Sequence, residues 1–580
     1  MTIELRTTPQ DAAYDIAVVG AGGAGMAAAL FAAIQGMKVL LIERTEYVGG
    51  TTALSAATTW IPNTHHSAGT GTVDSQENAA KFLRLAVGNR SPEDMRRAFL
   101  EAGPKAIDML ESNSDALFRA RPFHPDYISD LEGSTLRGRA LEPLPFDGRR
   151  LGAHFALVRP PIPEFTVLGG MMIDRDDVTH LLGMTRSFAS FRHALKLLAR
   201  HAVDRLGHPR GTRLVMGNAL IGRLLCSLDQ RGVDILVRTK VEELVKSGDA
   251  IVGLVASQDG ERRRIAVRRG VILASGGFNR HATRRAEMLA SPAPEHSPIA
   301  PGNTGEMHDL ALAAGGRYGT GNLDNAYWAP VSVRRRADGT TAVFPHFILD
   351  RGKPGMVTVN SKGLRFVNES TSYHLFGRAM FEANRTVPTI PAFLVTDSVA
   401  LRKYGIGMVH PGGKGLKPFL ADGYLTAAPT LDELARKLQI DAAGLRETVA
   451  RMNEYARTGV DPEFGRGTTD YHRANGDPAQ KPNPNLGPIG TPPFYAIRLY
   501  PGDIGAATGL VTNVDAQVLG PDDRPIRGLY ACGNDMNSVM GGVYPAPGIT
   551  IGPGITFAYI AARHAASPAA ARRTAADAAA

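Results

Sequence analysis

Residues 14–25, YDIAVVGAGGAG, decide the fold of this chain. The first half, residues 14–19, is apolar and rich in β-branched side chains, which predicts a buried strand. A helix-forming run follows at 26–35, and a second apolar run at 38–42 ends in Glu43. The order of strand, glycine-rich turn, helix and strand predicts a βαβ unit with G-x-G-x-x-G at its first turn.

At each of these three positions of the turn there is a physical reason for glycine. Gly20 permits a tight turn, Gly22 lets the backbone approach a pyrophosphate, and Gly25 lets helix and strand pack closely. The helix N-terminus offers unpaired N–H groups to phosphates, and an acid after the second strand can bind ribose hydroxyls. The complete unit predicts dinucleotide binding rather than a plain glycine-rich turn. The predicted binding residues are Gly20, Gly22, Gly23, Ala24, Gly25 and Glu43.

Later segments decide between FAD and NAD. A second glycine-rich turn stands at 47–52 (YVGGTT), and a strand is predicted at 233–241. Another strand closes on glycines at 270–278, and residues 528–534 (GLYACGN) form a turn, a strand and a turn. In this order the segments resemble FAD enzymes of the glutathione-reductase-like fold. The resemblance implies FAD as cofactor and assigns to it Gly49, Gly50, Thr51, Thr52, Ser55, Val241, Gly276, Gly277, Gly533 and Asn534.

The chain is too long for one core, so several domains are expected from its 580 residues. The resemblance implies an α/β fold in which a Rossmann-like FAD-binding domain is split in sequence. Composition changes near residue 291, and 465–493 is rich in Gly, Pro and Asn. We therefore predict an FAD-binding domain from 1–292 and 488–580, with an inserted α+β catalytic or cap domain at 293–487.

Residues 539–553, VMGGVYPAPGITIGP, carry the most specific signal. They resemble the Y-P-x-P-G-x-x-x-G-P segment of the 3-ketosteroid Δ1-dehydrogenases, FAD enzymes related to the fumarate reductase and succinate dehydrogenase flavoproteins. The resemblance spans nearly the entire chain, and it also covers 49–63, 125–147, 210–219 and 353–380.

The physical case for this segment rests on two prolines. Pro545 and Pro547 stiffen the turn, so the Tyr544 hydroxyl and the Gly548 N–H point in fixed directions. Two preorganised donors can hold a ketone oxygen and stabilise an enolate, the role of the matching residues in the family. A helix predicted from about 550 to 562 would point its positive end at the flavin. A buried packing tyrosine is the alternative for Tyr544. The cofactor assignment also takes in Gly548, Thr550 and Ile551.

A proton acceptor is expected at residues 368–373, NESTSY, which resemble the family's N-E-x-x-x-Y segment. In the family its tyrosine is the base, which implies that role for Tyr373. A phenol has a pKa of about 10 and needs assistance. Tyr127 resembles the assisting tyrosine, although Ile128-Ser129 follows where the family often has an aromatic residue and Pro.

The resemblance implies Δ1-dehydrogenation of a small apolar ketone such as a 3-ketosteroid, with a role in steroid and lipid degradation. Tyr373 would remove the α-proton, and hydride would pass to flavin N5. An unidentified acceptor would then reoxidise the flavin. Regiochemistry stays open, because a Δ4-(5α)-ketosteroid dehydrogenase or another cyclic-ketone dehydrogenase would use a similar pair of donors. A flavin-binding protein without turnover is a further alternative.

A fumarate-reductase-like enzyme is the other alternative. Such enzymes clamp a dicarboxylate with arginine and histidine, and residues 541–552 contain neither. Arg351, Arg365 and Arg378 stand elsewhere in the chain. The adjacent pair His65-His66 has no Cys or acidic neighbour in sequence, so no metal site is predicted.

Charge and composition argue against nucleic-acid-binding and membrane-spanning proteins. The net charge is +9, but the arginine runs 262–264 and 334–336 lie among turn residues and are expected to be solvated loops, so no nucleic-acid binding is predicted. Contact with an anionic membrane surface stays open. No apolar run long enough to span a bilayer is present.

The sequence also bears on the cellular location of the protein and on the role of the segment 160–182. Residues 1–13 lack a signal pattern, and Cys226 and Cys532 set no disulfide framework, which favours a cytoplasmic location. The segment 160–182 is apolar and contains glycines. It either covers the substrate entrance or packs as a buried loop.

Overall fold

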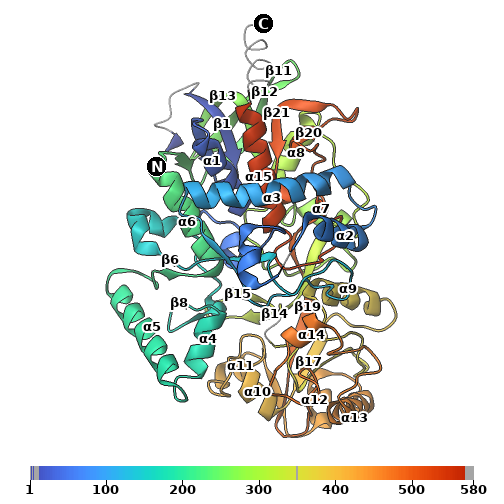
Figure 1. Cartoon of the computed structure of the whole chain (residues 1–580). Helices are drawn as coiled ribbons and strands as arrows, with labels where there is room; N and C mark the ends of the chain where they lie inside the picture. Colours follow the sequence, from blue (N-terminus) through green and yellow to red (C-terminus); the bar gives the residue numbers. More distant parts are fainter. Residues whose placement is uncertain (1, 3, 6–11, 73, 348–349, 568–580) are drawn as a thin grey trace.

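The computed structural model describes residues 2, 4–5, 12–72, 74–347 and 350–567. Figure 1 shows that the first and last described parts of the chain lie together at one end of the molecule, whereas the middle of the chain forms the other end. Two large sheets, one at each end, form the framework.

The larger sheet has parallel strands at its centre. β1 (Ala12–Val19) lies between β2 (Val39–Ile42) and β13 (Glu261–Leu273). Because β1, β2 and β13 run in the same direction, their carboxyl ends meet at one edge, as the β1 partners Val19↔Ile42 and Val19↔Leu273 show. The sheet also contains β10 (Asp234–Leu236), β11 (Lys240–Ser247), β12 (Ala250–Gln258), β20 (Gln517–Leu519) and β21 (Pro525–Ala531).

Helices from both ends of the chain pack beside this sheet. α1 (Gly23–Ile34) is apolar throughout and packs against α15 (Ile551–Ala566), where the rings of Phe31 and Tyr559 meet edge to face at 5.4 Å. The small side chains of α1 allow this close approach. α3 (Glu93–Asn113) crosses in front of α15 (Figure 1). The predicted α/β fold is confirmed, with a Rossmann-like unit that is assembled from the first and last parts of the sequence.

The second sheet is formed by the middle of the chain, in the order β15-β14-β19-β17-β16 with β18 beside β19. β19 (Phe494–Ala506) lies beyond the predicted domain boundary at residue 487, yet it pairs with β14 and β17 at the centre of this sheet. The remaining strands of the sheet are β14 (Ala326–Arg335), β15 (Thr341–Pro345), β16 (Met356–Val359), β17 (Ala392–Thr396) and β18 (Thr426–Ala428).

The other elements surround these sheets. Their helices are α2 (Gln76–Val87), α4 (Arg175–Leu182), α5 (Phe188–Gly207), α6 (Met216–Gln230), α7 (Ala282–Met288), α8 (Glu306–Ala313), α9 (Tyr373–Asn384), α10 (Ser398–Tyr404), α11 (Lys417–Ala421), α12 (Leu431–Leu438), α13 (Ala442–Thr458) and α14 (Asp470–Ala474). Their strands are β3 (Thr59–Trp60), β4 (Phe118–Ala120), β5 (Ala140–Pro143), β6 (Phe146–Asp147), β7 (Thr166–Val167), β8 (Met171–Met172) and β9 (Arg213–Leu214).

Two local expectations need correction. The arginine run 262–264 lies within β13, and Arg334 and Arg335 lie at the end of β14, so these residues are in strands rather than loops. Strand pairing and ion pairs such as Arg262 with Glu242 hold the first run in place. The strand predicted at 233–241 is two strands, because the chain turns between β10 and β11.

Among the described residues, no helix combines the length and apolar character needed to cross a bilayer. Both cysteines are buried and unpaired, so no disulfide links them.

Candidate active site

The first glycine-rich turn follows β1, and two of its glycines cannot be replaced without collision. Gly20 has φ +106°, and a Cβ there would lie 2.3 Å from the Ala274 carbonyl oxygen. A Cβ on Gly25 would lie 1.8 Å from the Gly20 oxygen. Gly22 has no neighbour within 4 Å on its Cβ side, and it is the N-cap of α1. The turn thus leaves open space at a helix N-terminus, which suits phosphate groups.

Gly25→Ala is expected to yield protein without bound flavin, because the added methyl group would push the turn away from α1. The measurement is the ratio of visible flavin absorbance to protein absorbance after purification. Gly207→Ala is the matched control, since a Cβ there meets nothing within 4 Å. A Gly25→Ala protein that retains full flavin content would contradict the account of this turn.

The second glycine-rich turn lies against the first. The Gly49 N–H donates to the Ala21 oxygen over 2.7 Å, and the Gly23 N–H donates to Thr52 Oγ1 over 3.2 Å. Gly49 and Gly50 both have positive φ, which favours glycine at these positions. The other predicted residues of this turn bond locally: Thr51 Oγ1 accepts from the Ala300 N–H, and Ser55 Oγ donates to the Thr52 oxygen.

Glu43 is buried where β2 ends, beside the first turn. Its carboxylate accepts from the Ala21 N–H and the Thr45 N–H, each over 2.9 Å. The Glu43 carbonyl accepts from the Thr239 N–H, which brings Val241 at the start of β11 to the same edge of the sheet. Glu43 therefore braces the first glycine-rich turn, and its predicted contact with ribose hydroxyls stays a prediction.

Asp535 joins two further glycine-containing turns and was missed from the sequence. Its buried carboxylate accepts from the Gly277 N–H and the Ser275 hydroxyl, each over 2.9 Å, and it pairs with His308 over 3.1 Å. Burial would raise the pKa of Asp535, but the bonds to His308 and Ser275 hold it below the usual value. Its only sequence signal is its place directly after the Gly533-Asn534 turn that follows β21.

These turns place most of the predicted cofactor residues on one edge of the larger sheet. Gly276 and Gly277 follow β13, and Gly533 and Asn534 follow β21, beside the turn after β1. The open N-terminus of α1, without an acidic residue in its first turn, fits the phosphates of FAD. The chain contains an FAD-binding domain, and bound FAD supplies a hydride acceptor.

Three tyrosines predicted from distant segments lie together. The Tyr127 hydroxyl donates to the Tyr373 hydroxyl over 3.1 Å. The Tyr544 ring stacks on Tyr127 at 5.8 Å between centroids and meets Tyr373 edge to face at 5.1 Å. The backbone fixes this arrangement, because the Tyr127 N–H donates to the Pro545 oxygen over 2.8 Å. Tyr373 is the first residue of α9, and Ser372 caps that helix.

Burial makes all three phenols hard to ionise. Desolvation raises the pKa of Tyr127 and Tyr373 well above the usual value, and it also raises that of Tyr544. Hydrogen bonds to Tyr373 and Thr550 offset part of the rise at Tyr544. Protonated Tyr544 is therefore suited to donate a hydrogen bond to an oxygen that gains negative charge.

Gly548 presents a second donor near Tyr544. Its φ is +91°, and a Cβ would lie 2.2 Å from the Thr58 oxygen, so only glycine fits. Its carbonyl accepts from the Trp60 N–H. Within the part of the chain that the structure describes, the Gly548 N–H has no acceptor. A buried N–H without an acceptor is costly unless a ligand supplies one.

Arg351 braces the loop around Tyr373. It is fully buried and donates to the Thr371 oxygen over 2.8 Å and to the Phe347 oxygen over 2.6 Å. The Phe347 ring packs edge to face on Tyr373 at 5.0 Å. The positive charge of Arg351 also opposes the rise in the pKa of Tyr127. No sequence feature other than its charge marked this residue.

The arginines that a dicarboxylate clamp would need are engaged elsewhere. Arg365 pairs with Asp461 over 2.9 Å, and Arg378 pairs with Asp324 over 2.9 Å. The Arg351 guanidinium donates to backbone carbonyls. These pairings do not favour a fumarate-reductase-like site.

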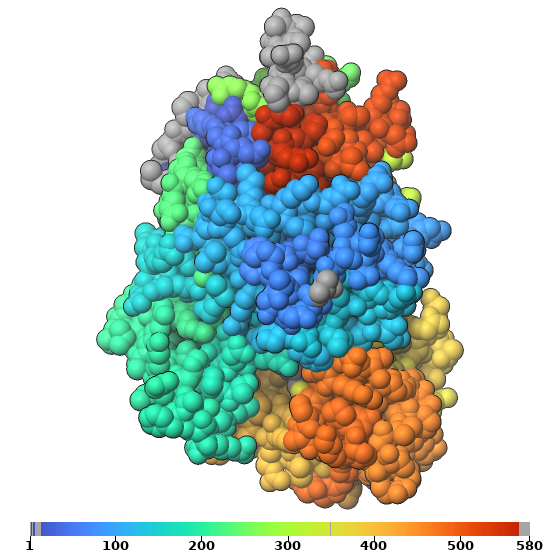
Figure 2. All heavy atoms as spheres, viewed as in Figure 1, coloured from blue at the N-terminus to red at the C-terminus, as the bar shows by residue number. Residues whose placement is uncertain are grey.

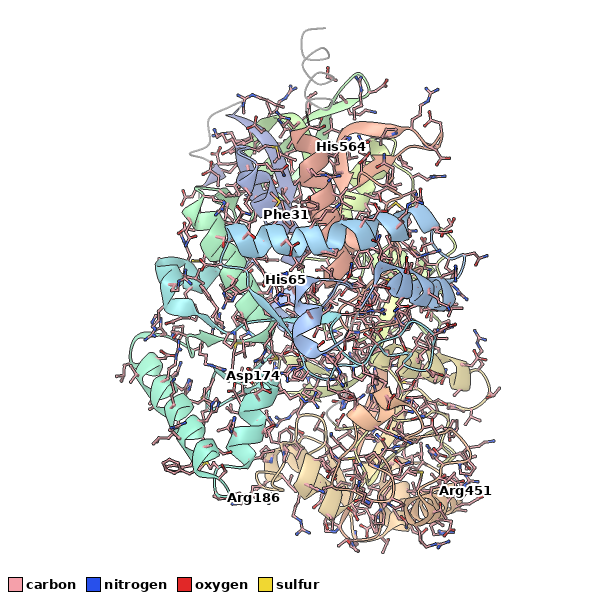
Figure 3. The ribbon with its side chains drawn as sticks, in the orientation of Figure 1. Phe31, His65, Asp174, Arg186, Arg451 and His564 are labelled. Carbon is pink, nitrogen blue, oxygen red and sulfur yellow. The ribbon has the colours of Figure 1, made fainter. Side chains whose placement is uncertain are left out.

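The prediction that the histidine pair lacks an acidic partner was wrong, because the fold brings two carboxylates to it. His65 Nδ1 lies 2.9 Å from Asp108, and His66 Nε2 lies 2.9 Å from Glu111, because α3 passes beside this turn (Figure 3). Ligand atoms of His65, His66 and Glu111 lie within 4.8 Å of one another. Hydrogen bonds to the carboxylates account for the arrangement.

Comparison with known proteins supports FAD as the cofactor. A family model described as an FAD binding domain matches residues 15–551. The chain is 38% identical to 4-oxocyclohex-2-ene-1-carboxylate 5-dehydrogenase of Sinomonas cyclohexanicum, covering 97% of this chain and 95% of that protein. It is 36% identical to 3-oxosteroid 1-dehydrogenase of Mycolicibacterium smegmatis, covering 97% and 98%.

A solved structure extends this likeness to three dimensions. The 3-ketosteroid Δ1-dehydrogenase of Sterolibacterium denitrificans, in complex with 1,4-androstadiene-3,17-dione, matches with a TM-score of 0.89 at 35% identity over 96% of this chain and 99% of that one. The FAD-binding model covers most of the chain, and the relatives match over nearly their whole length. The chain belongs to the FAD-dependent oxidoreductases acting on CH–CH groups, in the family of the 3-oxosteroid and 4-oxocyclohexenecarboxylate dehydrogenases.

Proposed function

We propose that this protein desaturates a 3-ketosteroid-like substrate and introduces a C=C bond conjugated with the ketone, in the manner of a Δ1-dehydrogenase. The observation that carries the proposal is the joint position of Tyr127, Tyr373 and Tyr544 beside the acceptor-free N–H of Gly548. A steroid-bound relative with the same fold supports it.

In the proposed mechanism the Tyr544 hydroxyl and the Gly548 N–H hold the ketone oxygen. These two donors stabilise the enolate that forms as the α-carbon loses its proton. Tyr373 accepts that proton, and the Tyr127 hydroxyl, already bonded to Tyr373, stabilises its ionised form. Arg351 positions the Tyr373 loop.

This mechanism predicts that ketone-dependent flavin reduction becomes faster as pH rises. The pKa of Tyr373 is raised, so at neutral pH the phenol is protonated and the competent phenolate is scarce. Below that pKa the rate is expected to increase by about tenfold per pH unit, since the phenolate fraction does. Stopped-flow flavin reduction across the alkaline range tests this. A flat profile would contradict a titrating tyrosine base.

A second candidate substrate is a 4-oxocyclohexenecarboxylate. The matching dehydrogenase of Sinomonas cyclohexanicum is as similar to this chain as the steroid enzymes are. Both reactions abstract a proton next to a ring ketone, so the same tyrosines serve either one.

The test compares the two ketones as reductants of the FAD-loaded protein without oxygen. A second-order rate constant for flavin reduction by 4-androstene-3,17-dione that exceeds the value for 4-oxocyclohex-2-ene-1-carboxylate supports the steroid proposal. The reverse order would assign the protein to the smaller, charged ketone. Reduction by neither, together with oxidation of the reduced flavin by fumarate, would overturn both.

A further inference from the structure

α5 turns apolar side chains toward solvent. Phe188, Phe191, Leu195 and Leu206 recur on one face of the helix, and their exposed fractions are 78%, 46%, 54% and 88%. Isolated exposed apolar side chains are ordinary, but a stripe that follows the helical repeat is not. An exposed apolar stripe of this kind indicates a surface that binds another molecule or a membrane.

The stripe continues round the tip of the hairpin formed by α4 and α5. Leu182, the last residue of α4, is 60% exposed, and Met184, in the turn that follows, is 37% exposed. Figure 1 shows the α4–α5 hairpin at the lower left edge of the molecule, and Arg186 is labelled at its free end in Figure 3. The space-filling view shows the same segment on the outer surface (Figure 2). The apolar side chains therefore gather at a projecting edge.

Polar side chains hold the hairpin in this orientation. Asp177 on α4 is buried and pairs with Arg213 over 2.7 Å and with His193 over 2.9 Å. Asp204 on the inner face of α5 is buried and accepts from the Thr212 N–H over 2.8 Å. The inner face of α5 thus buries polar His201 and Asp204 beside apolar Ala194 and Leu197, and the polar contacts on this face keep the exposed apolar stripe outward.

Unpaired cations accompany the apolar stripe. Arg186 lies at the tip, and Arg192 and Lys196 lie one turn apart along its flank. Within the described part of the chain these three side chains have no ion pair. Residues 182–206 contain five Lys or Arg and a single acidic residue, Asp204. The exposed edge is therefore both apolar and positively charged.

This combination points to one kind of partner. An apolar helical face with flanking Lys and Arg suits the interface of a bilayer that carries anionic lipids. A second copy of the chain would bring the same cations together, which is unfavourable. We propose that the α4–α5 hairpin attaches this protein to the surface of an anionic phospholipid bilayer, with Leu182, Met184, Phe188 and Phe191 entering the headgroup region.

Co-sedimentation of the FAD-loaded protein with vesicles tests the proposal. Vesicles of phosphatidylcholine alone are compared with vesicles that also contain phosphatidylglycerol. One variant carries Phe188→Ser, Phe191→Ser and Leu195→Ser, and another carries Arg186→Gln, Arg192→Gln and Lys196→Gln. Leu85→Ser is the matched control, because Leu85 is 49% exposed on α2, away from the hairpin.

The native protein is expected to sediment with the anionic vesicles, less so at high salt. Either hairpin variant should lower the vesicle-bound fraction by about tenfold or more, whereas Leu85→Ser should not. Flavin content and activity with a dissolved ketone should be unchanged in all variants, which separates loss of docking from misfolding.

Absence of native protein from the vesicle pellet would overturn the proposal. So would a dimer in solution that the triple Ser variant dissociates, since the stripe would then be a contact between two copies. Light scattering coupled to size-exclusion chromatography measures the oligomeric state. Equal binding to both kinds of vesicle would overturn the role given to the three cations.

Discussion

Tyr373→Phe should slow ketone-dependent flavin reduction by about 10³-fold, the loss expected when a positioned general base is removed. The ring fills the same space without its oxygen, so the packing of Tyr127, Phe347 and Tyr544 around it is kept. The measurement is the single-turnover rate of flavin reduction in a stopped-flow instrument without oxygen. Flavin content should equal that of the native protein.

Two further variants show whether the loss is specific to the site. Tyr544→Phe should also lose about 10²–10³-fold, because it removes one donor to the enolate oxygen. Tyr455→Phe should change the rate little, since Tyr455 lies on α13 in a separate apolar cluster. A Tyr373→Phe rate close to the native value would exclude Tyr373 as the proton acceptor.

Glu369→Ala should destabilise the fold by about 3–5 kcal/mol, the usual cost of leaving buried charges without a partner. Glu369 is fully buried and pairs with Arg365 over 2.8 Å and with Arg466 over 3.1 Å, and it accepts from the Thr358 N–H. Removing it leaves two buried guanidinium groups facing a cavity. Asp461 still pairs with Arg365, which limits the loss.

Thermal unfolding followed by flavin release and by circular dichroism measures this effect. Glu382→Ala is the matched control, because Glu382 is exposed and pairs with Arg385 on the surface, so a change below about 0.5 kcal/mol is expected. Equal melting temperatures for the two variants would contradict a structural role for the buried network.

The same carboxylate gives stability a predictable pH dependence. Burial would raise the pKa of Glu369, but Arg365 and Arg466 hold it below its usual value. A depressed pKa means that the contribution is present above the unfolded pKa of about 4.3 and is lost as pH falls through the folded value. The Glu369→Ala variant should therefore lose less of its stability on acidification than the native protein does.

Local sequence predicted the glycine-rich turns at this edge of the larger sheet, because each turn carries its own geometric constraint. A Cβ on Gly20 or Gly25 would meet a backbone oxygen, so the turn requires glycine at these positions. The glycine pattern therefore predicts the turn without knowledge of the rest of the fold. The meeting of Tyr127, Tyr373 and Tyr544 was implied only by family resemblance. Their separation along the chain exceeds 100 residues, and no local pattern states such a contact.

Residues that act through distant partners escaped prediction. The role of Asp535 becomes evident only in the folded chain, because the pairing of β13 with β21 places Ser275 and Gly277 beside it. The partners of His65 and His66 come from α3, more than 40 residues away. The arginines of β13 and β14 were expected in loops, because charge runs do not reveal a strand whose polar face is exposed.

The three tyrosines and Gly548 are proposed to form a site that dehydrogenates a ring ketone. The most direct measurement mixes the FAD-loaded protein with 4-androstene-3,17-dione without oxygen and follows flavin absorbance and product mass together. Bleaching of the flavin band is expected, together with a product two hydrogens lighter whose new double bond is conjugated to the ketone. An unchanged flavin with this steroid and with 4-oxocyclohex-2-ene-1-carboxylate would contradict the proposed function.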